Sequence, residues 1–250
     1  MTGASVVALK ELKILFGSPL AWLALALMQL VLAGVFLAHL EAFLQIQAQL
    51  IRVANPPGAT EAIVAPLFGV AAIALLMMTP VFTARLIAEE RRNKTLPFLI
   101  SAPISITEIV LGKFLGLMIF LLATMALVVA LSISLLAGGA LDFGVLLSNM
   151  GGLLLLSACF ASLGLYISCL SDQPATAGAG TMGVLLGLWV MDTLDEEDGL
   201  MRRLSLLARF ESFNRGTIDT FDLAYLTLFI LFFLALSIRW LSRERLNGFG

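Results

Sequence analysis

Residues 84–113 have the sequence ARLIAEERRNKTLPFLISAPISITEIVLGK. This stretch is densely charged, and it lies between two apolar segments that are each long enough to cross a membrane. A short apolar run, residues 96–100, occupies its middle. A charged membrane loop with an apolar centre indicates a docking element for a second protein. A surface helix that only anchors the loop at the membrane interface would show the same pattern, so the residues alone leave both interpretations open.

The composition places the chain among integral membrane proteins. Of its 250 residues, 60% are hydrophobic and only 13% are charged, whereas soluble domains carry roughly 25% charged residues. The net charge of −2 and the lack of a basic run argue against nucleic acid as a partner. Cys159 and Cys169 lie ten positions apart in one apolar segment, about 15 Å along a helix, which is too far for a disulfide.

We therefore predict an all-α integral membrane protein with a single transmembrane domain. Residues 4–16 are expected to form an interfacial amphipathic helix whose Lys10 and Lys13 reach lipid phosphates, with Leu9, Leu12 and Phe16 on another face. Six transmembrane helices are expected at about residues 20–40, 63–84, 108–136, 145–170, 175–191 and 222–240. The first is too long for the apolar region of a typical signal peptide, which favours an uncleaved span.

Two features are predicted between the fifth and sixth spans. An acidic cluster at residues 195–198 is followed by a short helix near residues 200–210, with Leu200, Leu204 and Leu207 on one face. This pattern predicts a helix resting on the outer membrane surface. Asp219 and Asp222 are expected to cap and begin the last span.

The distribution of basic residues predicts the orientation. Six spans place both termini on one side of the membrane. With the termini inside, ten basic residues face the cytoplasm, namely Lys10, Lys13, Arg85, Arg91, Arg92, Lys94, Lys113, Arg239, Arg243 and Arg245. Five face outside, namely Arg52, Arg202, Arg203, Arg209 and Arg215. An excess of Lys and Arg marks cytoplasmic segments, so we expect both termini and residues 85–107 in the cytoplasm.

Within residues 85–107, a short helix over residues 96–101 is predicted. Thr95 is the expected N-cap, and the helix should present Leu96, Phe98, Leu99 and Ile100. Ser105 and Glu108 form a capping-box pattern that marks the start of the third span.

Other chemistries find little support in the sequence. Residues 178–183 match GxGxxG but lie inside an apolar span without a preceding strand, so we reject a dinucleotide site. The spans carry no mid-membrane charge, which argues against ion coupling, and a Walker A motif and a HExxH motif are both absent. The Gly112–Gly116 and Gly183–Gly187 spacings are expected to be helix-packing seams. Candidate polar residues of a transport pathway are Gln29, Thr79, Asn149 and Ser157, each of which also suits a helix-packing hydrogen bond.

Residues 89–116, EERRNKTLPFLISAPISITEIVLGKFLG, resemble the conserved loop of type-2 ABC transporter permeases, the ABC-2 family. The usual pattern is close to EERxxGTLELLLSxPxSxxEIVLGK. Lys94 stands where that pattern has Gly, and Pro97 stands where it has Glu. Residues 10–22 resemble the family's N-terminal amphipathic helix, and residues 210–226 resemble the gliding-motility GldF-like branch.

The resemblance implies that residues 85–107 hold a coupling helix that docks on a separate ATPase subunit. The residues that it implies for docking are Glu89, Glu90, Arg91, Thr95, Leu96, Phe98, Leu99, Ser101 and Pro103. It implies a transporter of two permease copies, as a homodimer or with a close homologue, and two ATPases. ATP and Mg would be bound by the ATPase, so no catalytic residue, cofactor or metal is expected in this chain. Membrane lipid is an expected contact, and an auxiliary periplasmic protein is a further candidate partner.

The resulting hypothesis is the permease subunit of an ABC exporter, without enzymatic activity of its own. The alternative is a non-transporting membrane scaffold of an ATPase-driven envelope or motility machine. A standalone channel or secondary carrier is disfavoured because the spans lack polar or charged residues at their centres.

Overall fold

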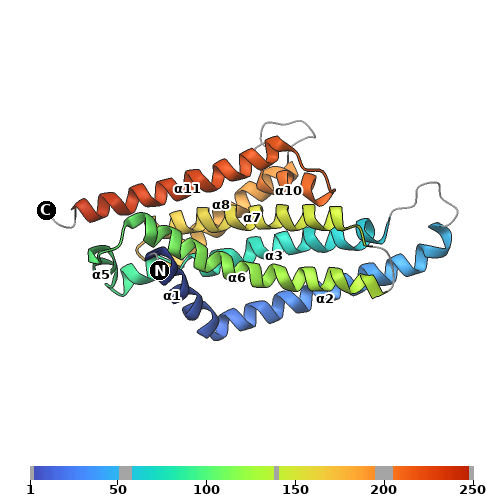
Figure 1. Cartoon of the computed structure of the whole chain (residues 1–250), viewed down its shortest axis with the longest axis horizontal. Coiled ribbons are helices and arrows are strands. Elements are labelled where there is room, and N and C mark those ends of the chain that lie inside the picture. The colour runs from blue at the N-terminus through green and yellow to red at the C-terminus, as the bar shows by residue number, and fades with distance from the viewer. Residues whose placement is uncertain (1–2, 51–57, 138–140, 195–204, 248–250) are drawn as a thin grey trace.

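The computed structural model describes residues 3–50, 58–137, 141–194 and 205–247. Every described element is helical, and the long helices lie side by side along one axis (Figure 1). Five described helices are long and apolar enough to cross a membrane, and a further helix has a shorter apolar part, Pro174–Val190. The predicted all-α membrane fold is thereby confirmed.

The long helices are α2 (Pro19–Leu50), α3 (Ala65–Thr83), α6 (Ile106–Ser134), α7 (Phe143–Leu170), α8 (Pro174–Leu194) and α11 (Thr220–Asn247). The shorter ones are α1 (Gly3–Gly17), α4 (Ala88–Arg92), α5 (Leu96–Ser101) and α10 (Leu206–Asn214). A π-helical turn, Thr60–Val64, leads into α3, and a 3₁₀ turn, Leu135–Ala137, ends α6. The GxGxxG string of residues 178–183 lies within α8, so its glycines are part of a helix and form no phosphate-binding turn.

Local sequence explains where several helices begin. The capping box at α6 is confirmed, since Ser105 Oγ accepts from Glu108 N and Glu108 Oε2 accepts from Ser105 N, both at 3.1 Å. Asp142 Oδ1 caps α7 by accepting from Gly144 N at 2.8 Å. Asp219 Oδ1 likewise accepts from Phe221 N at 2.9 Å at the start of α11. These side chains satisfy N–H groups that have no partner within the helix.

The predicted end of the first span, at about residue 40, is not where its helix ends. The helix α2 continues to Leu50, and the π-helical turn begins at Thr60. Residues 41–50, EAFLQIQAQL, contain neither Gly nor Pro and consist mostly of strong helix formers. The helix therefore continues past the length that a bilayer requires.

The central helix of the bundle is α7. It packs against α3, α6, α8, α10 and α11, and 72% of its most apolar window is buried, compared with 28% for α2 and 22% for α11. Its side chains Leu153, Leu156, Cys159 and Phe160 are fully enclosed. Both cysteines are free and buried, as expected for packing residues. α2 and α11 lie at the periphery and expose much of their apolar surface.

Only the second half of the predicted outer surface helix lies within the described residues, and its surroundings differ from the prediction. Leu200, Leu204 and the acidic cluster at residues 195–198 lie outside the described residues. The described helix α10 begins at Leu206 and buries Leu206, Phe210 and Phe213. It packs against α7, α3, α8 and α11, because its aromatic face is turned toward the bundle. It therefore fills the end of the bundle instead of resting on a membrane surface.

Two groups of elements mark opposite ends of the bundle (Figure 1). The helices α1 and α5 and the C-terminal end of α11 gather at one end, and α10 lies toward the other. Both ends of the described chain therefore lie on the same side as α5 (Figure 1).

Candidate functional site

The candidate site is the connection between α3 and α6, residues 85–107, which we call the coupling segment. It consists of a turn, α4, a second turn, α5 and a short extended link to the capping box of α6. Neighbouring side chains from α1, α7 and α11 hold this segment against one end of the bundle.

Ser168 of α7 fixes the turn between α3 and α4. Its hydroxyl oxygen accepts from Ile87 N and Ala88 N, each at 3.1 Å, and its hydroxyl donates to Ala84 O at 3.2 Å. Ser168 is fully buried, so these bonds satisfy two N–H groups at the start of α4 and one C=O group at the end of α3. The start of the coupling segment is thereby attached to the central helix.

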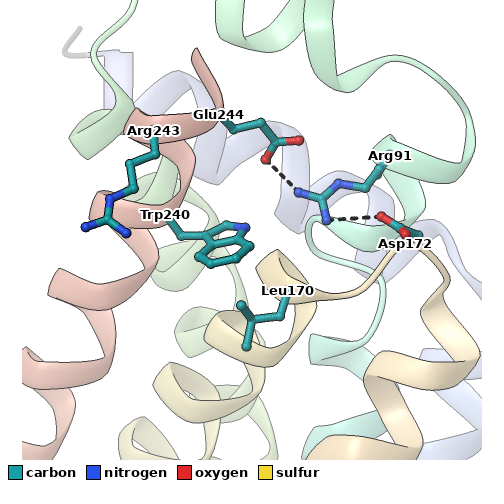
Figure 2. A pocket seen from close by; sticks show the side chains of 6 residues that line it. All are labelled: Arg91, Leu170, Asp172, Trp240, Arg243 and Glu244. Atoms are coloured by element: carbon teal, nitrogen blue, oxygen red, sulfur yellow. Dashed lines mark hydrogen bonds and ion pairs between the residues drawn. The ribbon is translucent and has the colours of Figure 1, made fainter. Parts of the chain in front are cut away.

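Arg91, in the last turn of α4, connects three parts of the chain (Figure 2). Its guanidinium donates to Glu244 Oε2 at 2.6 Å, to Ser171 O at 3.2 Å and to Asp172 Oδ1 at 3.4 Å. The Asp172 side chain is 87% exposed, whereas that of Glu244 is 37% exposed. Because water screens exposed ion pairs, the contact with Glu244 is the stronger one. It ties α4 to the end of α11.

Figure 2 also shows a hollow beside this network, with Trp240 and Leu170 on its apolar side. Its volume is about 520 Å³, and Arg243 completes the lining together with the three charged residues of the network.

Lys113 of α6 is the second charged centre of the site. Its ammonium donates to Glu11 Oε1 of α1 at 2.5 Å and to Glu90 Oε1 of α4 at 3.0 Å. The Lys113 side chain is 1% exposed and that of Glu11 is 8% exposed. Lys10 approaches the same Glu90 oxygen at 3.4 Å from the solvent side. One buried cation thus joins α1, α4 and α6.

The helix α5 has the predicted limits, Leu96–Ser101, but it does not present all four apolar residues that we expected. Leu96 and Ile100 are buried, and Leu99 packs partly against the core. Phe98 is 77% exposed. The inward side chains hold α5 on the bundle, which leaves Phe98 as its main outward apolar group.

Thr95 lies at the predicted N-cap position of α5, but its side chain does not cap the helix. Thr95 adopts a helical backbone conformation and caps no N–H of α5 with its side chain. Its hydroxyl instead donates to Glu90 O at 3.2 Å, and its own N–H donates to the same oxygen at 2.9 Å. The backbone of Thr95 thus remains bound to the preceding helix and cannot take the extended form of an N-cap.

The backbone conformation of Lys94 explains why the family pattern has glycine at this position. Its φ of +58° lies in the left-handed region that residues other than glycine seldom adopt. The chain reverses here between α4 and α5. Lysine at this position therefore carries a backbone strain that the usual glycine avoids.

The remaining predicted docking residues lie around α5. Ser101 is exposed and donates to Phe98 O at 3.2 Å, and Pro103 is exposed. The Glu89 side chain is partly exposed and forms no hydrogen bond or ion pair with the described part of the chain. A hollow of about 660 Å³ beside α5 is lined by Arg91, Lys94, Leu96, Pro97, Phe98, Ile100, Ser101, Glu244 and Arg245. Its mixed apolar and charged lining suits contact with another protein.

The N-terminal helix α1 packs on α6 more closely than an interfacial helix would require. A Cβ at Gly112 would meet Ala4 O at 2.7 Å, and one at Gly116 would meet Ala8 O at 3.0 Å. This confirms the first predicted glycine seam, whereas Gly183 and Gly187 have no neighbouring atom within 4 Å of an added Cβ, so the second prediction is wrong within the described chain.

The two predicted interfacial lysines of α1 have different surroundings. Lys13 is exposed, whereas Lys10 contacts Glu90.

The four candidate pathway residues are distributed over three helices. Asn149 is fully buried, and with its amide nitrogen facing α10 it donates to Phe213 O at 2.8 Å. Ser157 donates to Leu154 O of its own helix at 2.8 Å. Buried oxygens of Gln29 and Thr79 lack a hydrogen-bond partner in the described residues. Asn149 and Ser157 thus have packing contacts, and their role in a pathway stays a prediction.

Sequence reasoning overlooked Glu11, Ser168 and Glu244, which hold the coupling segment in place. A signal existed for Glu11, since it shares a helical face with Val7, Ala8 and Leu15, all of which are buried. A carboxylate on an apolar face predicts a buried cationic partner. Ser168 and Glu244 gave no comparable signal, because their partners lie about 80 and 150 positions away in the chain. Among the described residues, no three His, Cys, Asp or Glu side chains are grouped as a metal site requires.

Comparison with known proteins shows which family the chain resembles. Residues 5–194 match the family model of the ABC-2 family transporter proteins, which covers most of the chain from α1 to the end of α8. The coupling segment lies within the matched residues. No curated protein matches the chain.

Proposed function

Because the chain belongs to the ABC-2 family of transporter proteins, it is a transmembrane permease component of an ABC transporter, and we propose that it serves an exporter driven by a separate ATPase subunit. In this proposal the ATPase binds ATP and Mg, and the permease contributes the coupling segment and the membrane path. The family generally implies such an ATPase partner.

The observation that supports docking is the exposure of Phe98 on a helix that is otherwise anchored. Leu96 and Ile100 attach α5 to the bundle, while Phe98 projects beside a hollow with Lys94 and Arg245 on its lining. An exposed aromatic group at the centre of a mixed apolar and polar surface is typical of a protein-protein hot spot. We therefore assign Phe98 as the central contact with the ATPase.

The attachments of the coupling segment support the transmission of movement. Ser168 ties its start to α7, Arg91 ties α4 to α11, and Lys113 ties α4 to α1 and α6. A displacement imposed on α5 therefore reaches several membrane helices through short polar contacts. Movement of a docked ATPase would shift the bundle between two arrangements that bind the ATPase differently.

The direct test is the substitution Phe98→Asp. A charge at the centre of an apolar contact should weaken ATPase association about 30-fold or more, as for a hot-spot residue. The measurement is co-purification and binding affinity of the ATPase with full-length chain in mild detergent. The matched control is Phe143→Asp, because Phe143 is an exposed phenylalanine, 57% accessible, at the beginning of α7 and away from α5.

Normal association of the Phe98→Asp variant would contradict the docking assignment. Loss of association in both variants would show that the charge disturbs the membrane protein and not the contact. Leu99 is left unchanged because it packs partly against the core. Its substitution would change both ATPase binding and the stability of the fold, so the two effects could not be separated.

The same proposal includes two permease copies and two ATPases in a bacterial inner membrane, with both termini cytoplasmic. Whether an auxiliary periplasmic protein joins them is tested by the mass of the complex taken from its own membrane. The resemblance of residues 210–226 to the GldF-like branch stays a prediction, and extra envelope proteins in that complex would favour the scaffold alternative. Stimulation of ATP hydrolysis by a lipophilic substrate would favour transport.

A further inference from the structure

A third hollow lies between the coupling segment and α1. Its volume is about 360 Å³, and its lining includes Lys10, Ile14, Phe82, Arg85, Glu89 and Glu90. This volume falls in the ~300–1,000 Å³ range of small-molecule sites. Phe98 does not line this hollow, although Glu89, Glu90 and Thr95, which the family resemblance implies for docking, do.

Two side chains of opposite charge in this hollow have no partner among the described residues. Arg85 and Glu89 lie four positions apart, and neither side chain forms a hydrogen bond or ion pair with another described residue. Arg85 is exposed and Glu89 is partly exposed. The hollow therefore offers one open cation and one open anion to a ligand.

Glu90 adds a buried acceptor to the same lining. Both Lys113 and Lys10 contact its Oε1 atom, at 3.0 and 3.4 Å. Its Oε2 atom is buried and has no hydrogen-bond partner in the described residues. The Glu90 side chain as a whole is 15% exposed, so together with Glu89 it favours a ligand that carries positive charge and donates hydrogen bonds.

The remaining lining connects the hollow to the membrane. Ile14, Leu15 and Phe82 supply its apolar part. Ile14 is 54% exposed, and Val6 and Leu9 on the same helix are also exposed. An amphipathic helix with apolar residues outward lies at the boundary between headgroups and acyl chains. A ligand in this hollow can thus keep an acyl chain in the bilayer.

We propose that this hollow binds the headgroup of a phospholipid that carries a primary amine, such as phosphatidylethanolamine. The phosphate lies at Arg85, and the ammonium lies between the carboxylates of Glu89 and Glu90. The acyl chains leave past Ile14 and Phe82. The inference does not depend on the exporter role or on ATPase docking.

Headgroup chemistry separates this lipid from others. A primary ammonium has three N–H donors for the two carboxylates, whereas the trimethylated ammonium of a choline lipid has none. The lining holds three cations, Lys10, Arg85 and Lys113, and three anions, Glu11, Glu89 and Glu90. This balance gives no excess positive charge for a lipid with a net negative headgroup.

The experiment measures lipids retained by the full-length protein. The purified, delipidated chain is offered equal amounts of phosphatidylethanolamine, phosphatidylcholine and phosphatidylglycerol with the same acyl chains, and bound lipids are counted by native mass spectrometry. We expect one phosphatidylethanolamine per chain, preferred over phosphatidylcholine on the order of tenfold, as a charge-assisted hydrogen bond provides. Glu89→Gln should remove most of this preference, and Arg85→Gln should lower retention of both lipids. The matched control is Arg239→Gln, an exposed arginine on α11 outside the hollow.

Three results would overturn the inference. The first is equal retention of the amine and choline lipids by the wild-type chain. The second is an unchanged preference in Glu89→Gln, and the third is preferential retention of phosphatidylglycerol, which would indicate an anion site. Because Glu89 and Arg85 are at least partly exposed and have no partner within the described chain, both variants should keep the wild-type unfolding temperature. ATPase binding by Glu89→Gln, measured separately, distinguishes failure of this inference from failure of the docking proposal.

Discussion

At the residue scale, Lys113 illustrates how one buried charge can organise a site. Its ammonium lies between Glu11 and Glu90 and is shielded from solvent. Burial of an ion is costly unless paired groups satisfy it, so the three side chains stabilise the structure only as a set. The set holds α1 and α4 on α6, next to the exposed helix α5.

Lys113→Met provides a test of this set. The change leaves two carboxylates without their shared cation, and removal of one partner from a buried pair costs roughly 3–5 kcal/mol. We expect a clearly lower unfolding temperature in detergent. The measurement uses a thiol-reactive dye, because Cys159 and Cys169 are free and fully buried and react only after unfolding.

Lys13→Met is the matched control for that experiment, since Lys13 is exposed on α1. Its unfolding temperature should stay close to that of the wild type. Equal unfolding temperatures for Lys113→Met and the wild type would show that the buried charges contribute no stability as a set.

At the element scale, close approach between helices determines how α1 and α10 are placed. Both helices pack where a glycine lets their backbone or aromatic side chains come near. A Cβ at Gly112 would overlap α1, and a Cβ at Gly152 would meet Phe213 Cβ at 2.5 Å and Phe210 Cδ2 at 3.1 Å. Two hydrogen bonds also hold α10 in place. Ser148 Oγ donates to Phe213 O at 2.8 Å, and Asn214 Nδ2 donates to Ala65 O at 3.0 Å.

Two adjacent glycines of α7 allow a matched test of this packing. Gly152→Ala should displace α10 and destabilise the protein by about 1–3 kcal/mol, as overpacking does. Gly151 has open space around an added Cβ, so Gly151→Ala should be neutral or stabilising by up to ~1 kcal/mol through helix propensity. The unfolding temperatures of the two variants, measured with the thiol-reactive dye, should therefore change in opposite directions. A stabilised Gly152→Ala variant would mean that α10 packs elsewhere.

At the scale of the whole molecule, the coupling segment and both ends of the described chain share one end of the bundle (Figure 1). The basic residues of α1, α4 and the end of α11 gather there. Arg209 and Arg215 belong to the α10 region toward the other end, where Arg209 pairs with Asp222 at 2.9 Å. This separation of charge supports the predicted orientation, in which the basic end faces the cytoplasm.

Single cysteines at the two ends test that orientation. Leu246 near the end of α11 is 77% exposed, and Ile218 before its start is 66% exposed. We expect a membrane-impermeant thiol reagent to label Leu246→Cys only in inverted vesicles and Ile218→Cys only in right-side-out spheroplasts. The buried native cysteines should stay unlabelled. The reverse pattern would place the coupling segment outside the cell and contradict the docking proposal.

Local patterns were sufficient to predict the membrane class, the helix α5 and the capping box of α6. These features depend on apolar length, on proline positions and on side chains that bond to backbone within three or four residues. The departure from the family pattern at Lys94 was also visible in the sequence, and the structure supplies its reason in the positive φ.

Contacts between distant parts of the chain had to be seen in three dimensions. Lys113 meets Glu11 across 102 positions, and Arg91 meets Glu244 across 153. The burial of Leu96 and Ile100 and the burial of α10 could likewise be seen only in three dimensions. An apolar side chain in a short amphipathic helix is equally suited to a membrane surface, a protein core or a partner. The periodicity of the sequence predicts which face of a helix is apolar, but it does not predict what that face contacts. The contacts depend on how the other helices pack, which only the tertiary structure shows.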